Sequence, residues 1–234
     1  MNNMKEEQWE ATIHEPFSPM IMETEVPDKF IDIVNKVGDE VLNDETKSAK
    51  WDWSNHLVGK VHKEIQIPIT DKENAEYCKN VIRDGCVEYL QQMVTDKRAY
   101  ISNSVILHTN QGGSSNVKRE NINISQSWIV SQYKNEYNPW HQHSGDLSGV
   151  IYLKIPKDMD KFYEKELEDH YPVSGMIQFM QGDKQSLRSD TLTFKPECGM
   201  MLIFPSWLKH SVFPFYVDGE RRCMSFNAYY VNKK

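Results

Sequence analysis

From residue 99 onward the sequence is a succession of short strand-like segments, and this pattern most constrains the fold. The segments are rich in β-branched and aromatic residues and are bounded by Gly, Pro, Asn and Asp, as is typical of strands joined by turns. They are AYISNSVILH (99–108), INISQSWIVSQYK (122–134), LSGVIYLKIP (147–156), GMIQFMQ (175–181), TLTFKP (191–196), GMMLIFP (199–205) and RRCMSFNAYYVN (221–232). Such a series predicts a β-sandwich or barrel rather than a parallel sheet.

Two helices are predicted before these strands. The segment 27–44 opens with Pro27 and Asp28 and has apolar residues near a period of 3.6, as expected of an amphipathic helix. The segment 71–94 is the stronger of the two, because Asp71 can cap it and one apolar stripe follows along its length. We therefore expect helices first and a double-sheet β core after them.

This order of elements predicts a single α+β domain, mainly β, over residues 1–234. Residues 1–98 would form a helical support region, and residues 99–234 the β core. Two stretches interrupt the core. Residues 110–123 include Gly-Gly-Ser-Ser, which is typical of a flexible loop. Residues 157–175 are too charged for a buried strand and are expected to be a surface insertion that, like the loop, could gate access to a site.

The composition excludes several classes of protein. The chain has 27 basic and 34 acidic residues and a formal net charge of -7, which argues against general nucleic-acid binding. No stretch approaches the roughly 18 apolar residues of a membrane helix, and the N-terminus lacks a signal-peptide pattern. We expect a cytoplasmic protein that does not interact with membranes. The four cysteines have no CxxC spacing, so neither a zinc ribbon nor a disulfide framework is predicted.

The stretch YNPWHQHSGDLSG (137–149) is the first candidate for a chemical site. Side chains at i and i+2 of an extended segment point to the same side, so His141 and His143 can converge on one metal ion. Asp146 follows closely and is a further candidate ligand. A third ligand must come from elsewhere, and His210 in FPSWLKH, expected at another strand end, is the best candidate. The alternative is that these histidines are ordinary surface or structural residues.

Paired arginines open the last predicted strand, eleven and twelve residues after His210. A guanidinium can bind a carboxylate through two parallel hydrogen bonds, so an arginine beside a metal could hold an acidic ligand. Arg221 and Arg222 are the candidates, and strand alternation sends their side chains to opposite faces. The alternative is that both are solvated charges at a strand end.

Taken together, NPWHQHSGDLSGVIYLKIP, GMMLIFPSWLKHSVFPF and ERRCMSFNAYY resemble the iron(II)- and 2-oxoglutarate-dependent oxygenases. More narrowly, they are similar to the prolyl-hydroxylase-like oxygenases found in tailed-phage and marine bacterial genomes. The resemblance covers roughly residues 99–232, and FPSWL-x-H is its most specific part. It implies a double-stranded β-helix of the jelly-roll or cupin type, with the N-terminal helices as a supporting layer.

The resemblance also implies roles for individual residues. His141 matches the first iron ligand and His210 the distal one. Arg221 matches the arginine that binds the far carboxylate of 2-oxoglutarate, with Arg222 as the near alternative. Tyr133 is placed like a tyrosine that often contacts this cosubstrate.

The second iron ligand is the point where the sequence departs from the common pattern. Most such oxygenases have H-x-D or H-x-E, whereas residue 143 is a histidine. Either His143 completes a three-histidine site, or Asp146 folds back to supply a carboxylate. The spacing favours His143 slightly, and Asp146 would then orient an imidazole as a hydrogen-bond partner.

The implied function is that of an Fe(II)- and 2-oxoglutarate-dependent dioxygenase that uses O₂ to hydroxylate a C–H bond and releases succinate and CO₂. A peptide side chain, a nucleobase or a small metabolite would each be compatible as substrate. If the protein is viral, its compartment would be the host cytoplasm. Two alternatives stay open: a non-catalytic jelly-roll structural or binding protein, and a three-histidine metal dioxygenase that does not use 2-oxoglutarate.

Overall fold

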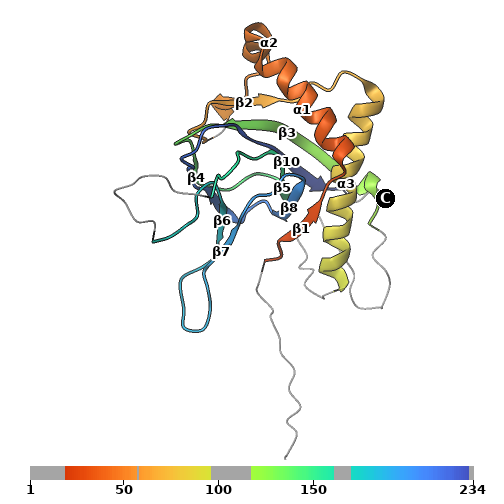
Figure 1. Cartoon of the computed structure of the whole chain (residues 1–234). Helices are drawn as coiled ribbons and strands as arrows, with labels where there is room; N and C mark the ends of the chain where they lie inside the picture. Colours follow the sequence, from red (N-terminus) through yellow and green to blue (C-terminus); the bar gives the residue numbers. More distant parts are fainter. Residues whose placement is uncertain (1–18, 57, 96–116, 161–169, 232–234) are drawn as a thin grey trace, which may run out of the picture.

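We describe a computed structural model of the chain over residues 19–56, 58–95, 117–160 and 170–231 (Figure 1). The helical elements are α1 (Asp28–Leu42), α2 (Glu45–Lys50), α3 (Lys72–Thr95) and the short 3-10 helices η1 (Ser54–His56) and η2 (Arg119–Asn121). The strands are β1 (Met22–Glu25), β2 (Lys63–Gln66), β3 (Ile122–Gln132), β4 (Asn138–His141), β5 (Leu147–Lys154), β6 (Ile177–Met180), β7 (Thr191–Phe194), β8 (Met200–Pro205), β9 (Lys209–Val212) and β10 (Arg221–Tyr230). None of the helices in these ranges is long and apolar enough to cross a membrane.

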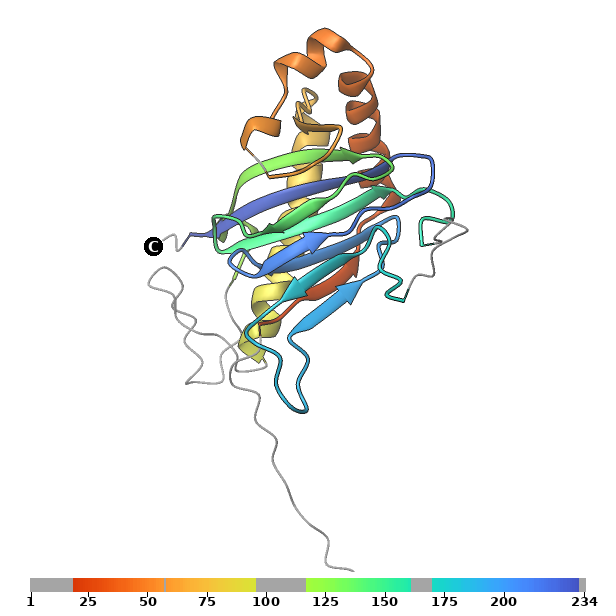
Figure 2. The ribbon, with the colours of Figure 1, turned by 90° about the vertical axis from the view of Figure 1, so that its left-hand side faces the viewer.

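The strands form two antiparallel sheets that face each other. The larger sheet has the order β1-β8-β5-β10-β3-β2, and the smaller has the order β4-β9-β6-β7. Along the chain from β3 to β10, the path crosses repeatedly between the two sheets, as it does in a jelly roll. Figure 2 shows the two sheets with the helices behind them. The predicted α+β class with a double-stranded β-helix core is confirmed.

Strand alternation divides the interior into two apolar cores. In the larger sheet, Ile129 and Ile151 point to the helices, while their neighbours Val130 and Tyr152 point to the smaller sheet. Both faces of the central strands are therefore covered, which explains why β5 and β8 are almost continuously apolar. Burial of each large apolar side chain contributes roughly 1.5–3 kcal/mol. The face toward the smaller sheet is the one on which a site can form.

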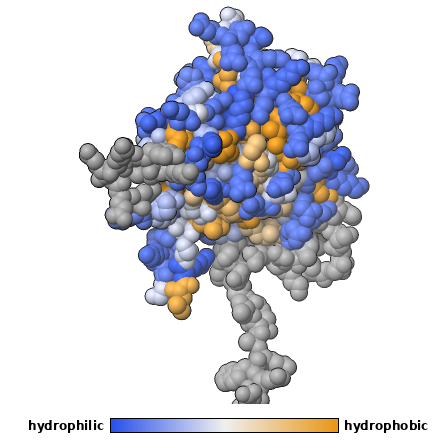
Figure 3. Space-filling view, in the orientation of Figure 1, coloured by the Kyte–Doolittle hydropathy of each residue, from blue (hydrophilic) through white to orange (hydrophobic). Residues whose placement is uncertain are grey.

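The helices cover the outer face of the larger sheet, as the sequence predicts. Helix α1 buries Phe30, Val34 and Val41 in the same core as Ile129 and Ile151 of the sheet. Asp71 caps α3, since its Oδ1 accepts from the backbone N–H of Asn74 at 2.7 Å. Both predicted helices are thus present. The surface in Figure 3 is largely hydrophilic, consistent with apolar residues gathered in these cores.

Several short elements differ from the sequence prediction. Strands β1, β2, β4 and β9 and helix α2 were not predicted, because these segments of four to six residues are mostly polar and carry no apolar run. The β4 segment contains Pro139, a residue that is uncommon within strands. It is a strand because it pairs with β9 of the smaller sheet.

Three other predicted segments lie wholly or partly outside the described residues. The predicted strand 99–108 does so entirely. Of the predicted loop 110–123, residues 110–116 lie outside the described residues, and residues 117–123 include η2 and the start of β3. Of the predicted insertion 157–175, residues 161–169 lie outside the described residues. Residues 157–160 and 170–175 are turns and irregular backbone.

Candidate metal centre and its pocket

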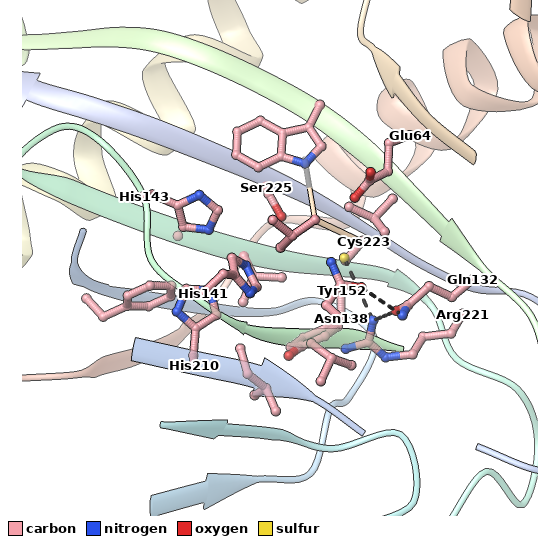
Figure 4. Close-up of a pocket in the computed structure, with 18 residues that line it drawn as sticks. Glu64, Gln132, Asn138, His141, His143, Tyr152, His210, Arg221, Cys223 and Ser225 are labelled. Atoms are coloured by element: carbon pink, nitrogen blue, oxygen red, sulfur yellow. Dashed lines mark hydrogen bonds between the residues drawn. The ribbon is translucent and has the colours of Figure 1, made fainter. Parts of the chain in front are cut away.

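Three histidines meet between the two sheets. His141 ends β4, His143 follows two residues later, and His210 lies in β9 directly opposite His141 in the strand pairing. Their ligand nitrogens all lie within 4.8 Å of one another. The three side chains face one another across the pocket in Figure 4. This spacing lets one ion contact all three imidazoles.

Backbone carbonyls orient two of the three rings. Nδ1 of His141 lies 2.7 Å from the carbonyl oxygen of Pro139, and Nδ1 of His210 lies 2.9 Å from that of Leu208. A carbonyl oxygen can only accept a hydrogen bond, so in each ring Nδ1 carries the proton and Nε2 keeps its lone pair. This hydrogen bonding fixes the tautomer that a metal ligand requires.

The pocket also keeps the three rings neutral. Burial lowers the pKa of His210 to about 3, and the charges of the other two histidines add to this effect. Burial, with the charge of His141, lowers the pKa of His143 to about 4, and burial likewise lowers the pKa of His141. Neutral imidazoles are the form that binds a metal. At neutral pH the cluster is therefore ready to act as a three-nitrogen donor set.

Aromatic side chains hold the histidines in place. Phe179 and Phe204 pack on the ring of His210, with centroid separations of 5.6 and 4.9 Å. Trp128 lies beside His143 at 5.6 Å. These contacts restrict the rotamers of the rings and exclude water from the apolar wall of the pocket.

Asp146 lies away from the histidine cluster. Its Oδ2 accepts from the backbone N–H of Tyr230 at 2.9 Å, and its own backbone bonds Ala228 and Ser206. Among the described residues, the group that can share one ion contains the three histidines and not Asp146. The carboxylate fastens the loop that carries His143 to the end of β10.

Arg221 enters the same pocket from β10 and is almost fully buried. Its Nε donates to the carbonyl oxygen of Gly175 at 3.2 Å, and its Nη1 donates to Oε1 of Gln132. The guanidinium lies 5.1 Å from the ring centre of Tyr152. Nη2 of Arg221 is buried and has no hydrogen-bond partner among the described residues, and the buried hydroxyl of Tyr152 has none there besides Arg221. A guanidinium nitrogen that lines a pocket without a partner is free to donate to an anionic ligand.

Arg222 points to the opposite face of the same strand. Its guanidinium pairs with Glu220 at 2.7 Å and with Asp39 of α1 at 2.8 Å, and it also bonds Asn35. The structure thus brings one of the two candidate arginines to the pocket. Arg222 instead ties the helical layer to the sheet.

Tyr133 is not brought to the pocket. It follows the last residue of β3, is 40% exposed and packs edge-to-face against His62 at 5.1 Å. Its neighbour Gln132 lines the pocket in its place. The alternation of side chains at the end of β3 accounts for this difference.

Several pocket residues were missed by the sequence reasoning: Glu64, Gln132, Asn138, Tyr152, Cys223 and Ser225 (Figure 4). Tyr152 could have been found, because it shares the face of Val150 on the predicted strand 147–156. Cys223 shares the face of Arg221 for the same reason. Glu64 and Asn138 lie on β2 and β4, two mostly polar strands that were not predicted, so no sequence signal assigned their faces.

A jelly-roll core that holds a three-histidine cluster and a buried arginine in one pocket defines a class of candidate metal-dependent enzymes. Residues 126–227 match the family described as "Putative 2OG-Fe(II) oxygenase". The matched family is a family of enzymes, and the resemblance stated from the sequence is confirmed by this match over residues 126–227. No curated protein sequence matches the chain.

Solved structures with which the chain aligns include three oxygenases. A Pseudomonas putida prolyl-4-hydroxylase has 12% identity and a TM-score of 0.46, covering 92% of this chain and 93% of that one. A Trichoplax adhaerens prolyl hydroxylase in complex with a hypoxia inducible factor peptide fragment has 12% identity and a TM-score of 0.49, covering 89% and 82%. A Burkholderia pseudomallei oxidoreductase of the 2OG-Fe(II) oxygenase family has 13% identity and a TM-score of 0.38, covering 74% and 62%.

Proposed function

We propose that the protein is an Fe(II)- and 2-oxoglutarate-dependent dioxygenase that hydroxylates a C–H bond of its substrate. The observation that carries this proposal is the placement of Nη2 of Arg221, which has no hydrogen-bond partner among the described residues, and of the neighbouring Tyr152 hydroxyl in the same pocket as the histidine cluster. A metal alone would leave these donors unsatisfied. A dicarboxylate whose other end reaches the metal satisfies both.

In this proposal His141, His143 and His210 hold Fe(II), and Arg221 with Tyr152 binds the far carboxylate of 2-oxoglutarate. These residues fit Fe(II) and 2-oxoglutarate, because neutral imidazole is a suitable ligand for iron and guanidinium is the preferred partner of a buried carboxylate. When bound, the metal and cosubstrate supply O₂ activation, with release of succinate and CO₂.

The residues of the chain perform the remaining tasks. The carbonyls of Pro139 and Leu208 keep Nε2 of His141 and His210 directed at the ion. The ring of Tyr152 lies against the guanidinium of Arg221 and restricts its position. Phe179, Phe204 and Trp128 keep bulk water from the cluster, which strengthens every charge interaction within the pocket.

Asp146 is not a ligand in this proposal. His143 is the second iron ligand, and Asp146 holds the loop between β4 and β5 in place. Because three neutral imidazoles bring no negative charge, the bound dicarboxylate supplies part of the charge that a carboxylate ligand would otherwise give.

The all-histidine donor set also favours a second candidate function, a metal dioxygenase that does not use 2-oxoglutarate. The two functions differ in what they require of Arg221. Anaerobic titration of the Fe(II)-loaded protein with 2-oxoglutarate separates them, because a keto acid chelated to Fe(II) gives a weak visible charge-transfer band. We expect a saturable band in the wild type and none after Arg221→Met. Iron uptake without a band in the wild type would favour the second candidate.

A further inference from the structure

Glu64 is the carboxylate among the residues that line the pocket, and neither the metal centre nor the carboxylate site uses it. It lies on β2 and pairs with Val130 of β3. Glu64 itself is outside the region 126–227 that matches the oxygenase family. Its neighbour Ile65 points into the core beneath the helices, so Glu64 points toward the smaller sheet. Glu64 of the N-terminal region thus places its carboxyl group in the interior of the β core.

The side chain of Glu64 is buried and closely packed. The side chain is 1% exposed, and a Cβ built on Gly59 would lie only 2.9 Å from its Oε1. Burial raises the pKa of Glu64 to about 7, a hydrogen bond from Asn138 opposes this, and the charge of Asp52 adds to it. Burying an acid costs folding free energy unless the acid is hydrogen-bonded, so the hydrogen bond from Asn138 offsets part of the cost of burying Glu64.

Hydrogen bonds connect Glu64 to Arg221 through two amides. Nη1 of Arg221 donates to Oε1 of Gln132, and Nε2 of Gln132 donates to Oδ1 of Asn138 at 3.1 Å (Figure 4). The side chain of Asn138 then hydrogen-bonds the carboxyl group of Glu64. The chain therefore runs from a cation, through two amides, to an acid.

The direction of this chain is determined by its two ends. A guanidinium can only donate, so Gln132 must turn its oxygen to Arg221 and its NH₂ group to Asn138. Asn138 must then turn its own NH₂ group to Glu64. A carboxyl group offers an acceptor oxygen in both protonation states, so it can end the chain at any pH. If this acceptor is removed, the NH₂ group of Asn138 loses its partner, and Asn138 and Gln132 lose the anchor that holds them against the guanidinium.

We propose that Glu64 is a positioning residue for Arg221. Acting through Asn138 and Gln132, it holds Nη1 in a fixed hydrogen bond and so keeps Nη2 directed at the carboxylate of the ligand. This inference rests on the proposed function, because it assumes that Arg221 binds 2-oxoglutarate. It adds a residue from the N-terminal region to the determinants of cosubstrate affinity.

The test is the same anaerobic titration of Fe(II)-loaded protein with 2-oxoglutarate, applied to a set of variants. We expect Glu64→Leu to weaken 2-oxoglutarate binding by roughly five- to tenfold, the effect of one lost or misaligned hydrogen bond. Glu64→Gln keeps an acceptor oxygen without the charge and should bind within about twofold of wild type. Glu23→Leu makes the same substitution at an exposed position of β1, at the other edge of the larger sheet, and is the matched control.

Asn138→Leu breaks the next link of the chain and gives an independent variant if Glu64→Leu folds poorly. Because both residues act in one chain, the double variant should bind no more weakly than Asn138→Leu alone. In steady-state assays, Glu64→Leu should raise KM for 2-oxoglutarate and leave kcat nearly unchanged.

Each outcome has a definite meaning. Wild-type affinity in both Glu64→Leu and Asn138→Leu overturns the inference while leaving the proposed function intact. Equal losses in Glu64→Gln and Glu64→Leu also overturn it, because charge rather than an acceptor would then be what matters. A wild type that binds iron and shows no response to 2-oxoglutarate overturns the proposed function itself.

Discussion

His141 and His210 lie directly opposite each other where β4 pairs with β9, with ring centroids 4.3 Å apart. Residues 69 positions apart in the chain thereby present two imidazoles to one point, and His143 completes the group. The pairing of two four-residue strands therefore decides whether the candidate metal centre exists.

The first prediction concerns the identity of the second ligand. His143→Ala should lower the affinity for Fe(II) by at least about a hundredfold, since it removes a ligand rather than an outer partner, whose loss typically costs 10- to 100-fold. Asp146→Ala should bind iron as the wild type does and instead lose roughly 1–2 kcal/mol of unfolding free energy, because the N–H of Tyr230 loses its acceptor. Anaerobic iron titration and chemical unfolding measure the two effects. The reverse pattern would make Asp146 the ligand.

The second prediction uses the adjacent arginines as a matched pair. Arg221→Met should abolish measurable 2-oxoglutarate binding or weaken it by about a hundredfold, the scale of a buried charge-assisted contact. Arg222→Met should keep 2-oxoglutarate affinity but destabilise the protein by on the order of 3 kcal/mol, because Glu220 loses its buried partner. Titration and urea unfolding of both variants provide the measurements. Equal affinity losses in both would show that Arg221 has no specific role.

The third prediction concerns Glu64 and pH. Its pKa is about 7 in the folded protein against 4.5 ordinarily, so the folded state binds the proton more tightly. The wild type should therefore lose stability relative to Glu64→Gln as pH rises from about 4.5 to about 7, by up to about 3 kcal/mol. Urea unfolding of both proteins at pH 5 and pH 8 measures this difference. Unfolding free energies that change in parallel with pH would contradict the buried, proton-binding state of Glu64.

The fourth prediction is that metal binding stabilises the fold through the paired strands. A ligand that binds the folded state alone at 100 times its Kd adds about 2.7 kcal/mol to the unfolding free energy. Anaerobic Fe(II) should therefore raise the thermal midpoint of the wild type, and a chelator should reverse the increase. His210→Ala should show no such increase, whereas His170→Ala, which alters a histidine outside the cluster, should respond like the wild type.

The sequence predicted most of the large elements and part of the candidate site. The periodicity of 27–44 and 71–94 matches α1 and α3, and the apolar runs match β5, β8 and β10. These elements are long enough for local patterns to report their burial. The H-x-H spacing predicted His141 and His143 as candidates, and an expected position at a strand end predicted His210. Glu64 and Asn138 were not, because each lies on a strand of four residues whose partner is distant in sequence.

The amino-acid sequence by itself determined the long helices α1 and α3 and the apolar strands such as β5 and β8, because the apolar period of a segment depends on its own residues. It also supplied the H-x-H spacing and the two adjacent arginines. The tertiary structure decided which face of each strand meets the pocket, and hence that Arg221 rather than Arg222 lies beside Tyr152. It likewise placed Asp146 on the backbone of Tyr230 and Glu64 at the end of a hydrogen-bond chain. These choices depend on strand pairing and on what covers each face of a sheet, which no local pattern contains.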